Sequence, residues 1–181
     1  LAAAGYDRRR LRGVLLTHAH WDHISGLPDF PGAPVWVTAA ERRFVREGGM
    51  VTRLARSFAA LHYEEYGFPG GPYLGFPVSF DVYGDGAIVV VPAPGHTPGS
   101  VIVFLTLRSG QRYALVGDLA WQQEGITLRE ERPFVQRLLA DHDEARVRAH
   151  LRHLAALAAR FPQLILVPAH DARGYATMPR L

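Results

Sequence analysis

Apolar residues occur along this chain in short runs, and most of these runs stop at glycine, proline or a group of polar residues. The runs that are typical of β-strands cover residues 14–16, 35–37, 78–83, 87–91, 100–107, 112–116 and 164–167. Gly-Asp-Gly at 84–86 and Arg-Ser-Gly-Gln at 108–111 each separate two of these runs. This spacing predicts two β-hairpins.

Helical periodicity is found in four other segments, and one further helix end is indicated near the start of the chain. The segments are residues 24–27, 38–46, 51–61 and 141–160, and residues 1–6 read as a helix end closed by Gly5. Thr38 is expected to cap its helix, with Glu41 at the third helical position as in a capping box. The mixture of helices, hairpins and short strands predicts an α/β fold with a mixed sheet.

The composition fits one compact domain over residues 1–181, because 48% of the residues are hydrophobic and 20% are charged. The absence of cysteine excludes disulfides, cysteine-liganded zinc and thiol nucleophiles.

All 20 basic residues are arginines, which indicates a GC-rich, bacterial coding sequence. The net charge of +3 is small and Arg8–Arg12 is the main basic cluster, so no nucleic-acid partner is expected. No apolar run reaches the roughly 18 residues of a membrane span, and a cytoplasmic location is expected.

Histidine and aspartate interrupt the apolar pattern at four places, each directly after a predicted strand. The first is His-Ala-His-Trp-Asp-His at 18–23, and the others are Pro-Gly-His-Thr-Pro-Gly at 94–99, Val-Gly-Asp at 116–118 and Pro-Ala-His-Asp at 168–171. Loops that follow strands are where rigid scaffolds place functional residues. Because buried imidazoles and carboxylates are costly without partners, a metal ion is the usual reason for such a cluster.

The candidate metal ligands are His18, His20, Asp22, His23, His96, Asp118 and His170. Seven side chains suffice for two ions if one carboxylate bridges them, since a catalytic zinc uses three protein ligands and keeps one position open. In an extended segment His18 and His20 point to the same side, and the following turn is expected to carry Asp22 and His23 to a second position. Two divalent ions are therefore expected, zinc first, with manganese or iron as alternatives.

These motifs resemble those of the metallo-β-lactamase fold superfamily, and the resemblance extends from about residue 13 to residue 171. It implies an αββα sandwich with the metal site at one edge. It also implies that one metal is held by His18, His20 and His96, the other by Asp22, His23 and His170, with Asp118 between them. Only about a dozen residues precede the first strand, so the family's N-terminal strands are expected to be missing from a truncated domain.

Within that superfamily, the motifs look most similar to those of lactonases and glyoxalase II. The resemblance implies a dinuclear metal-dependent hydrolase in which a metal-bridged hydroxide attacks a small ester, lactone or related acyl substrate. Asp22 would orient the nucleophile or carry its proton. A phosphodiesterase on the same site, a mono-iron oxidoreductase similar to persulfide dioxygenases, and a truncated domain without catalysis are the alternatives.

Four other positions are candidates for supporting roles. Acyl-homoserine-lactone lactonases place a tyrosine three residues after the bridging aspartate, whereas this chain has Trp121, which donates a hydrogen bond but cannot deliver a proton. Trp21 and Trp121 either wall the site or are packing residues, and Asp171 is a candidate to orient His170 or a neighbouring ligand through its ring N–H. His62 and the Tyr-Glu-Glu-Tyr segment after it either line a substrate pocket or form a solvated helix end.

Overall fold

The computed structural model describes residues 5–58, 61–130 and 132–179. The strands in this part of the chain are β1 (Val14–Leu15), β2 (Val35–Thr38), β3 (Tyr63–Tyr66), β4 (Phe80–Asp81), β5 (Ile88–Pro92), β6 (Val101–Thr106), β7 (Arg112–Gly117) and β8 (Leu164–Pro168). The helices are α1 (Trp21–Ile24), α2 (Ala39–Glu47), α3 (Arg53–Ser57), α4 (Gln123–Thr127), α5 (Phe134–Ala140), α6 (Glu144–Arg160) and α7 (Ala172–Ala176).

The strands form two sheets of different construction. β1, β2 and β3 pair in parallel in that order. β4 to β8 form a second sheet in sequence order, and its neighbours are antiparallel except for the parallel pair β7 and β8. The two predicted hairpins are confirmed as β4–β5 and β6–β7, and the second sheet is the predicted mixed one. Because β6 runs against both of its neighbours, β5, β7 and β8 all end at the same edge of the sheet.

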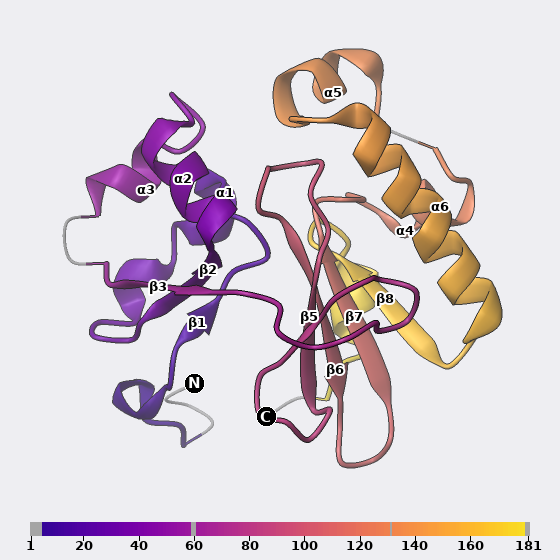
Figure 1. Cartoon of the computed structure of the whole chain (residues 1–181), viewed down its shortest axis with the longest axis horizontal. Coiled ribbons are helices and arrows are strands. Elements are labelled where there is room, and N and C mark those ends of the chain that lie inside the picture. The colour runs from indigo at the N-terminus through magenta and orange to yellow at the C-terminus, as the bar shows by residue number, and fades with distance from the viewer. Residues whose placement is uncertain (1–4, 59–60, 131, 180–181) are drawn as a thin grey trace.

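Three apolar clusters hold these elements together as four layers (Figure 1). One cluster joins the three-stranded sheet to α1, α2 and α3, and another lies between the two sheets. The largest packs the five-stranded sheet against α4 and α6. Alternate residues of β6 pack in different clusters. Ile102 and Phe104 face the helices, while Val101 and Val103 face the other sheet. The αββα sandwich is therefore confirmed.

Several short helices differ from the sequence prediction. Residues 24–27 do not begin a helix, because α1 ends at Ile24 and a separate 3₁₀ turn follows at Leu27–Asp29. The pattern over 51–61 is helical only in α3, while residues 59–60, like most of the helix end predicted at 1–6, lie outside the described residues. α4, α5 and α7 were missed because helices of five to seven residues are too short to show a helical period.

The longest helix, α6, begins three residues later than predicted. It starts at Glu144, where the side chain of Asp143 accepts a hydrogen bond from the N–H of Arg146 and so caps the helix. His142 and Asp141 precede this cap, and the N–H groups of His142 and Asp143 donate to the carbonyls of His96 and Gly95. The segment predicted as the first turn of the helix thus lies against the loop of His96 instead.

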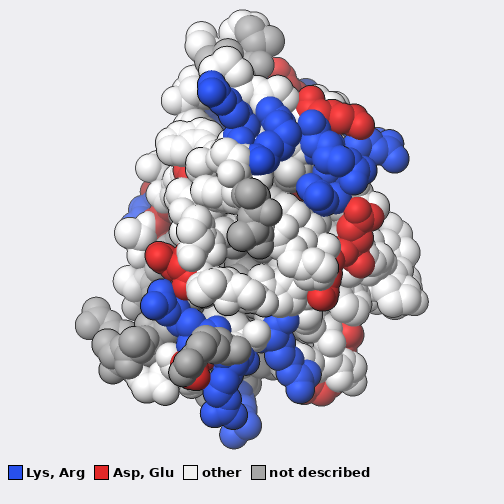
Figure 2. All heavy atoms as spheres, turned by 90° about the vertical axis from the view of Figure 1, so that its left-hand side faces the viewer, with Lys and Arg blue, Asp and Glu red and all other residues white. Residues whose placement is uncertain are grey.

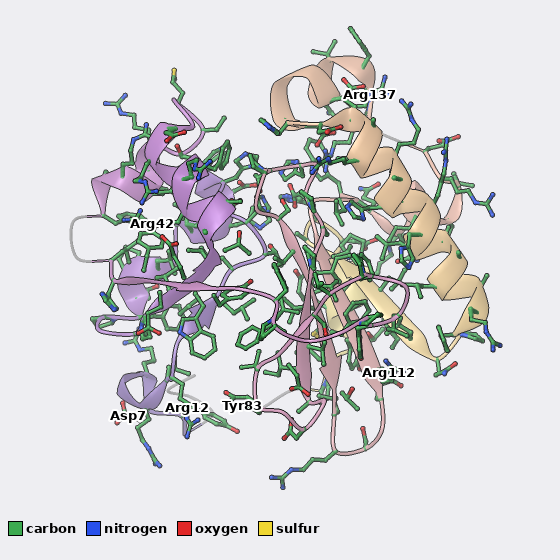
Figure 3. All side chains as sticks on the ribbon, viewed as in Figure 1. Asp7, Arg12, Arg42, Tyr83, Arg112 and Arg137 are labelled. Carbon is green, nitrogen blue, oxygen red and sulfur yellow. The ribbon has the colours of Figure 1, made fainter. Side chains whose placement is uncertain are left out.

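The Tyr-Glu-Glu-Tyr segment is a strand, so its interpretation as a helix end is wrong. Tyr63–Tyr66 forms β3 at the edge of the parallel sheet. Its two glutamates are exposed. The guanidinium of Arg42, which is labelled in Figure 3, lies 4.3 Å from the ring centroid of Tyr63. The two adjacent charged residues hide the period of two that would reveal a strand. The preceding His62 is largely exposed beside Glu64, 3.6 Å away, and does not line the cavity described below.

The capping box predicted at the start of α2 is only half present. The hydroxyl of Thr38 accepts a hydrogen bond from the N–H of Glu41 at 3.1 Å, as expected for a helix cap. The carboxylate of Glu41 does not return to the N–H of Thr38 and contacts two distant loops instead.

The face of the molecule formed by the N-terminal layers carries charges of both signs. Figure 2 shows arginines gathered toward two ends of this face, with aspartates and glutamates beside them and uncharged residues between. This distribution agrees with the small net charge of +3. Within the described residues, no helix is both long enough and apolar enough to cross a membrane.

Leu154→Ala is expected to lower the free energy of unfolding by about 2–5 kcal/mol. Leu154 is fully buried where α6 packs against the five-stranded sheet, so truncation leaves a cavity. Urea unfolding of the variant and the wild-type chain in the same metal state measures the loss. Arg152→Ala, on the exposed side of the same helix, is the control and is expected to change stability by no more than about 0.5 kcal/mol. A similar small loss for Leu154→Ala would contradict the packing of α6.

Candidate metal centre

The candidate ligands come together because four strands end at one edge of the sandwich. His96, Asp118 and His170 follow β5, β7 and β8, and residues 18–23 follow β1 from the other sheet. Thr17 joins the two sheets at this edge, since its carbonyl accepts a hydrogen bond from the N–H of Val101 at 3.0 Å. Gly117, with φ of +55°, allows the loop of Asp118 to pass close by, because a Cβ there would lie 3.0 Å from the Thr17 side chain.

His18, His20 and His96 form the first of two ligand groups. One nitrogen of each ring lies within 4.8 Å of those of the other two, and all three side chains are buried. The hydroxyl of Thr17 lies 3.3 Å from Nδ1 of His18, and a carboxylate oxygen of Asp141 lies 2.9 Å from Nδ1 of His96. Both contacts engage Nδ1, and Nε2 of His18 and of His96 has no hydrogen-bond partner and so is left for a metal.

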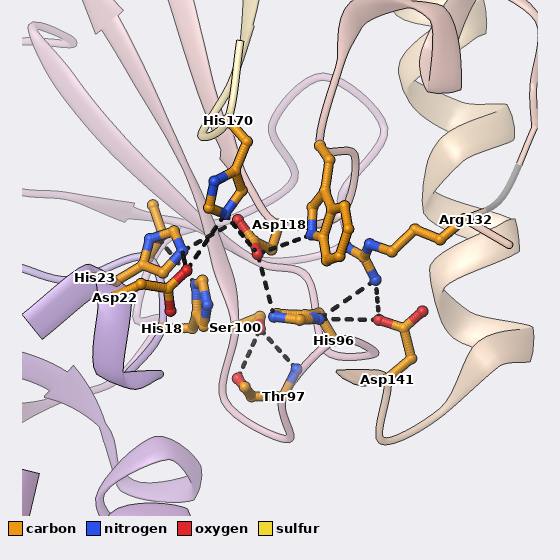
Figure 4. Close-up of polar contacts among 12 residues, drawn as sticks. His18, Asp22, His23, His96, Thr97, Ser100, Asp118, Arg132, Asp141 and His170 are labelled. Atoms are coloured by element: carbon orange, nitrogen blue, oxygen red, sulfur yellow. Dashed lines mark hydrogen bonds and ion pairs between the residues drawn. The ribbon is translucent and has the colours of Figure 1, made fainter. Parts of the chain in front are cut away.

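Asp22, His23, Asp118 and His170 form the second group, again with one ligand atom each within 4.8 Å of the others. Asp118 Oδ1 lies 3.2 Å from Nε2 of His23, and Asp118 Oδ2 lies 3.2 Å from Nε2 of His170. The same Oδ2 is 3.6 Å from Nε2 of His96 in the first group (Figure 4). Asp118 thus contacts both groups, and the structure brings all seven sequence candidates together.

The donor atoms of the site fit metal ions. Among the described residues, the buried ligand atoms without a hydrogen-bond partner include Nε2 of His18, His23 and His96 and Oδ1 of Asp118. Buried polar atoms normally form hydrogen bonds, so four such atoms in one place without one, although two of them lie only 3.2 Å apart, require an explanation. Cations would satisfy these lone pairs together, and a set of imidazoles and carboxylates suits zinc, manganese or iron.

The electrostatics of the first group favour neutral imidazoles. Burial lowers the pKa of His18 well below its ordinary 6.5, and burial lowers the pKa of His20 to about 4. Both rings are therefore neutral at pH 7, which is the form that binds a metal.

In the second group, His23 and Asp118 each favour the charged form of the other. Burial opposes ionisation of Asp118, but contact with His23 and the other imidazoles holds the pKa of this carboxyl well below its usual range. Burial also opposes the charged form of His23, but Asp118 raises the pKa of His23 above 6.5. Because a metal binds the neutral imidazole, protonation of His23 competes with the metal, and affinity falls as the pH falls through this raised pKa.

A chain of contacts behind the ligands links His96 to Asp118 (Figure 4). The carboxylate of Asp141 accepts from Nδ1 of His96 and from the guanidinium of Arg132. That guanidinium lies 4.8 Å from the ring centroid of Trp121, whose indole N–H donates to Asp118 Oδ2 at 3.0 Å. Arg132 and Asp141 were not predicted from the sequence, because they lie 36 and 45 positions from His96 in a region without a recognised motif.

A cavity of about 380 Å³ opens beside the ligands. It is lined by His20, Trp21, Asp22, Val51, His96, Asp118, Trp121, Gln136, Ala140 and His170. The two tryptophans therefore wall the site, which is one of the two roles that the sequence left open. A second cavity of about 230 Å³ adjoins it and shares Trp121 and Gln136.

In the contacts of the described residues, Asp171 bonds to neither His170 nor another ligand, so the orienting role suggested by the sequence is wrong. Its buried carboxylate accepts hydrogen bonds from the N–H of Gln123 at 3.0 Å and from the backbone and guanidinium of Arg173. Both carboxylate oxygens are thus occupied in capping α7 and joining it to the start of α4.

Residues 1–170 match the family model described as the metallo-beta-lactamase superfamily. The chain therefore belongs to the metallo-β-lactamase superfamily, which confirms the resemblance seen in its motifs. It is 35% identical over 183 residues to a probable metallo-hydrolase of Mycobacterium tuberculosis, an alignment that covers 94% of this chain and 58% of that protein. It is 28% identical over 134 residues to an N-acyl homoserine lactonase of Rhizobium johnstonii, covering 68% and 49% of the two chains.

The fold is also similar to solved structures. An N-acyl homoserine lactone hydrolase with its product bound at the catalytic metal centre superposes with a TM-score of 0.70 at 21% identity. The superposition covers 99% of this chain and 63% of the other. This chain thus spans about half to three fifths of the curated relatives that it matches.

Proposed function

We propose that this protein is a metal-dependent hydrolase that holds two divalent cations and acts on a small ester, lactone or related acyl substrate. The observation that carries the proposal is the position of Asp118, whose oxygens lie 3.2 Å from Nε2 of His23 and 3.6 Å from Nε2 of His96. One carboxylate between two groups of imidazoles is the arrangement expected for a two-metal site. The names of the metallo-hydrolase and lactonase relatives support the class of reaction.

The ligands divide between the two cations as the geometry groups them. His18, His20 and His96 would hold one cation and Asp22, His23 and His170 the other, and Asp118, which contacts both groups, would serve both. Zinc is the expected metal, with manganese or iron as alternatives. When bound, two dications would lower the pKa of a water molecule toward neutrality and would polarise an acyl carbonyl.

Asp22 is the catalytic carboxylate of the proposed site. Its side chain is 31% exposed and lines the cavity, and its Oδ2 lies 3.5 Å from Nε2 of His170. From this position it can take the proton of the attacking water and pass it to the oxygen of the leaving group. The N–H of Trp121 is already bonded to Asp118, and an indole does not release a proton, so Trp121 orients the shared carboxylate instead.

The cavity favours a small and partly apolar substrate. Its volume of about 380 Å³ is near the lower end of the roughly 300–1,000 Å³ found for small-molecule sites. The ligands form one wall, while Trp21, Val51, Trp121 and Ala140 offer apolar surface. An acyl substrate with a short hydrocarbon portion fits this cavity, because its carbonyl can face the ligands while its hydrocarbon portion contacts the apolar surface.

Elemental analysis of the purified chain is expected to find close to two zinc, manganese or iron ions per molecule. The metal-loaded chain is expected to hydrolyse a short-chain lactone or aryl ester at least about tenfold faster, in kcat/KM, than an aryl phosphodiester. The reverse preference would make the protein a phosphodiesterase. One iron per chain with sulfite formed from a persulfide, and no hydrolysis, would replace the hydrolase by an oxidoreductase.

A further inference from the structure

A buried carboxylate outside the ligand set joins two of the ligand loops. Glu41 lies in the first turn of α2 and is only 1% exposed. Its Oε1 accepts a hydrogen bond from the N–H of Ala19 at 2.6 Å. Its Oε2 accepts from the hydroxyl of Thr97 at 2.7 Å and from the N–H of Gly99 at 3.1 Å.

Each loop that Glu41 contacts carries ligands of the first group. Ala19 stands between His18 and His20, and Thr97 directly follows His96. These two loops come from different sheets, so no regular strand pairing fixes the distance between them. The three hydrogen bonds of one carboxylate therefore join the two loops beside the ligands, in addition to the single backbone bond between Val101 and Thr17.

The loop of His96 packs directly against the start of α2. The hydroxyl of Thr38 donates to the carbonyl of Gly99 at 3.1 Å. A Cβ at Gly99 would lie 2.2 Å from the backbone nitrogen of Glu41, so only glycine permits this approach. The loop is thus held at the helix N-terminus, where a carboxylate is also favoured by the helix dipole.

The buried carboxylate of Glu41 depends on the three hydrogen bonds that it accepts. Burial raises the pKa of Glu41 above its ordinary 4.5, while the three hydrogen bonds oppose that shift. A glutamine has the same shape but a single acceptor oxygen. In a Glu41→Gln variant, at least one of the three donors would face the NH₂ group and lose its partner.

We propose that Glu41 is a positioning residue that holds the loop of His18 and His20 at a fixed distance from the loop of His96. The role rests on the proposed metal centre, and its direct effect is on the first ligand group, because only that group takes ligands from both of the loops that Glu41 joins. Glu41 contacts no substrate in this arrangement and acts through the ligands that it spaces.

Amide hydrogen exchange in the metal-free protein tests the contact itself. Glu41→Gln is expected to speed exchange of whichever of the Ala19 and Gly99 amides faces the new NH₂ group at least about tenfold, with the amides of β6 unchanged. Glu47→Gln, at the exposed end of the same helix, is the matched control and is expected to leave all of them unchanged. Unchanged exchange at Ala19 and Gly99 in Glu41→Gln would overturn the proposal.

Zinc titration against a chromophoric chelator, with cobalt absorption spectra as a second readout, tests the consequence for the metal. Glu41→Gln is expected to bind one of two zinc ions about 10- to 100-fold more weakly and to change the cobalt spectrum of that site alone. Equal weakening of both ions would indicate general loosening, and two unchanged affinities would remove the role; either result overturns the proposal. A wild-type chain that binds no zinc would instead overturn the proposed function, and the positioning role with it.

Thr97→Val provides a second variant if Glu41→Gln does not fold, as judged by circular dichroism. It removes one of the three donors while the carboxylate and both backbone bonds remain. A smaller, few-fold loss of affinity at the same single site is expected. Two unchanged zinc affinities in this variant would overturn the proposal.

Discussion

Asp118→Ala is expected to lower kcat for the lactone or ester at least about 10³-fold and to leave no more than one metal ion per chain. The carboxylate lies within 3.6 Å of histidines from both ligand groups, so its loss removes the shared ligand and leaves the second group with three ligands. A second cation supplies several kcal/mol of transition-state stabilisation, and about 1.4 kcal/mol corresponds to each factor of ten in rate.

Elemental analysis and initial rates on the same preparation measure the two effects together. Asp85→Ala is a matched control, because Asp85 lies in the exposed turn between β4 and β5, outside the ligand loops. Its carboxylate accepts a hydrogen bond from the N–H of Ala87. Its metal content and rate are expected to stay within about twofold of the wild-type values. An Asp118→Ala chain with full rates would contradict the two-metal mechanism.

The arrangement of the candidate ligands was predictable because it depends on local pattern. Each of them follows a short apolar strand, and strands that run in the same direction end at one edge of a sheet. Residues 18–23 add a spacing that separates two ligand positions within six residues. The sequence therefore predicted that His18 and His20 belong to one ligand group and Asp22 and His23 to another, and the structure shows this division.

The residues that support the ligands were not predictable, because their contacts span long distances in the chain. Glu41 fits a capping box by its local pattern, yet its carboxylate reaches residues 22, 56 and 58 positions away. Asp171 stands beside a ligand in sequence, and its oxygens nevertheless bind Gln123 and Arg173. Single-sequence patterns report neighbours along the chain, and such tertiary contacts override them.

Asp141→Ala is expected to reduce both stability and metal affinity, for different reasons. The guanidinium of Arg132 is 6% exposed and would lose its carboxylate, which is expected to lower the free energy of unfolding by about 3–5 kcal/mol. His96 would lose the acceptor of its Nδ1–H, so its ring would no longer be held toward the metal. The expected result is about 10- to 100-fold weaker zinc binding at the first group.

A double variant, Asp141→Ala with Arg132→Met, separates these two effects. Removing both members of a buried ion pair is often close to neutral, so urea unfolding is expected to show that most of the lost stability returns. Zinc competition is expected to show no such recovery, because His96 still lacks its acceptor. If affinity returned together with stability, Asp141 would act on the metal through the fold alone. If affinity stayed low while stability returned, the hydrogen bond from His96 to Asp141 would be what orients this ligand.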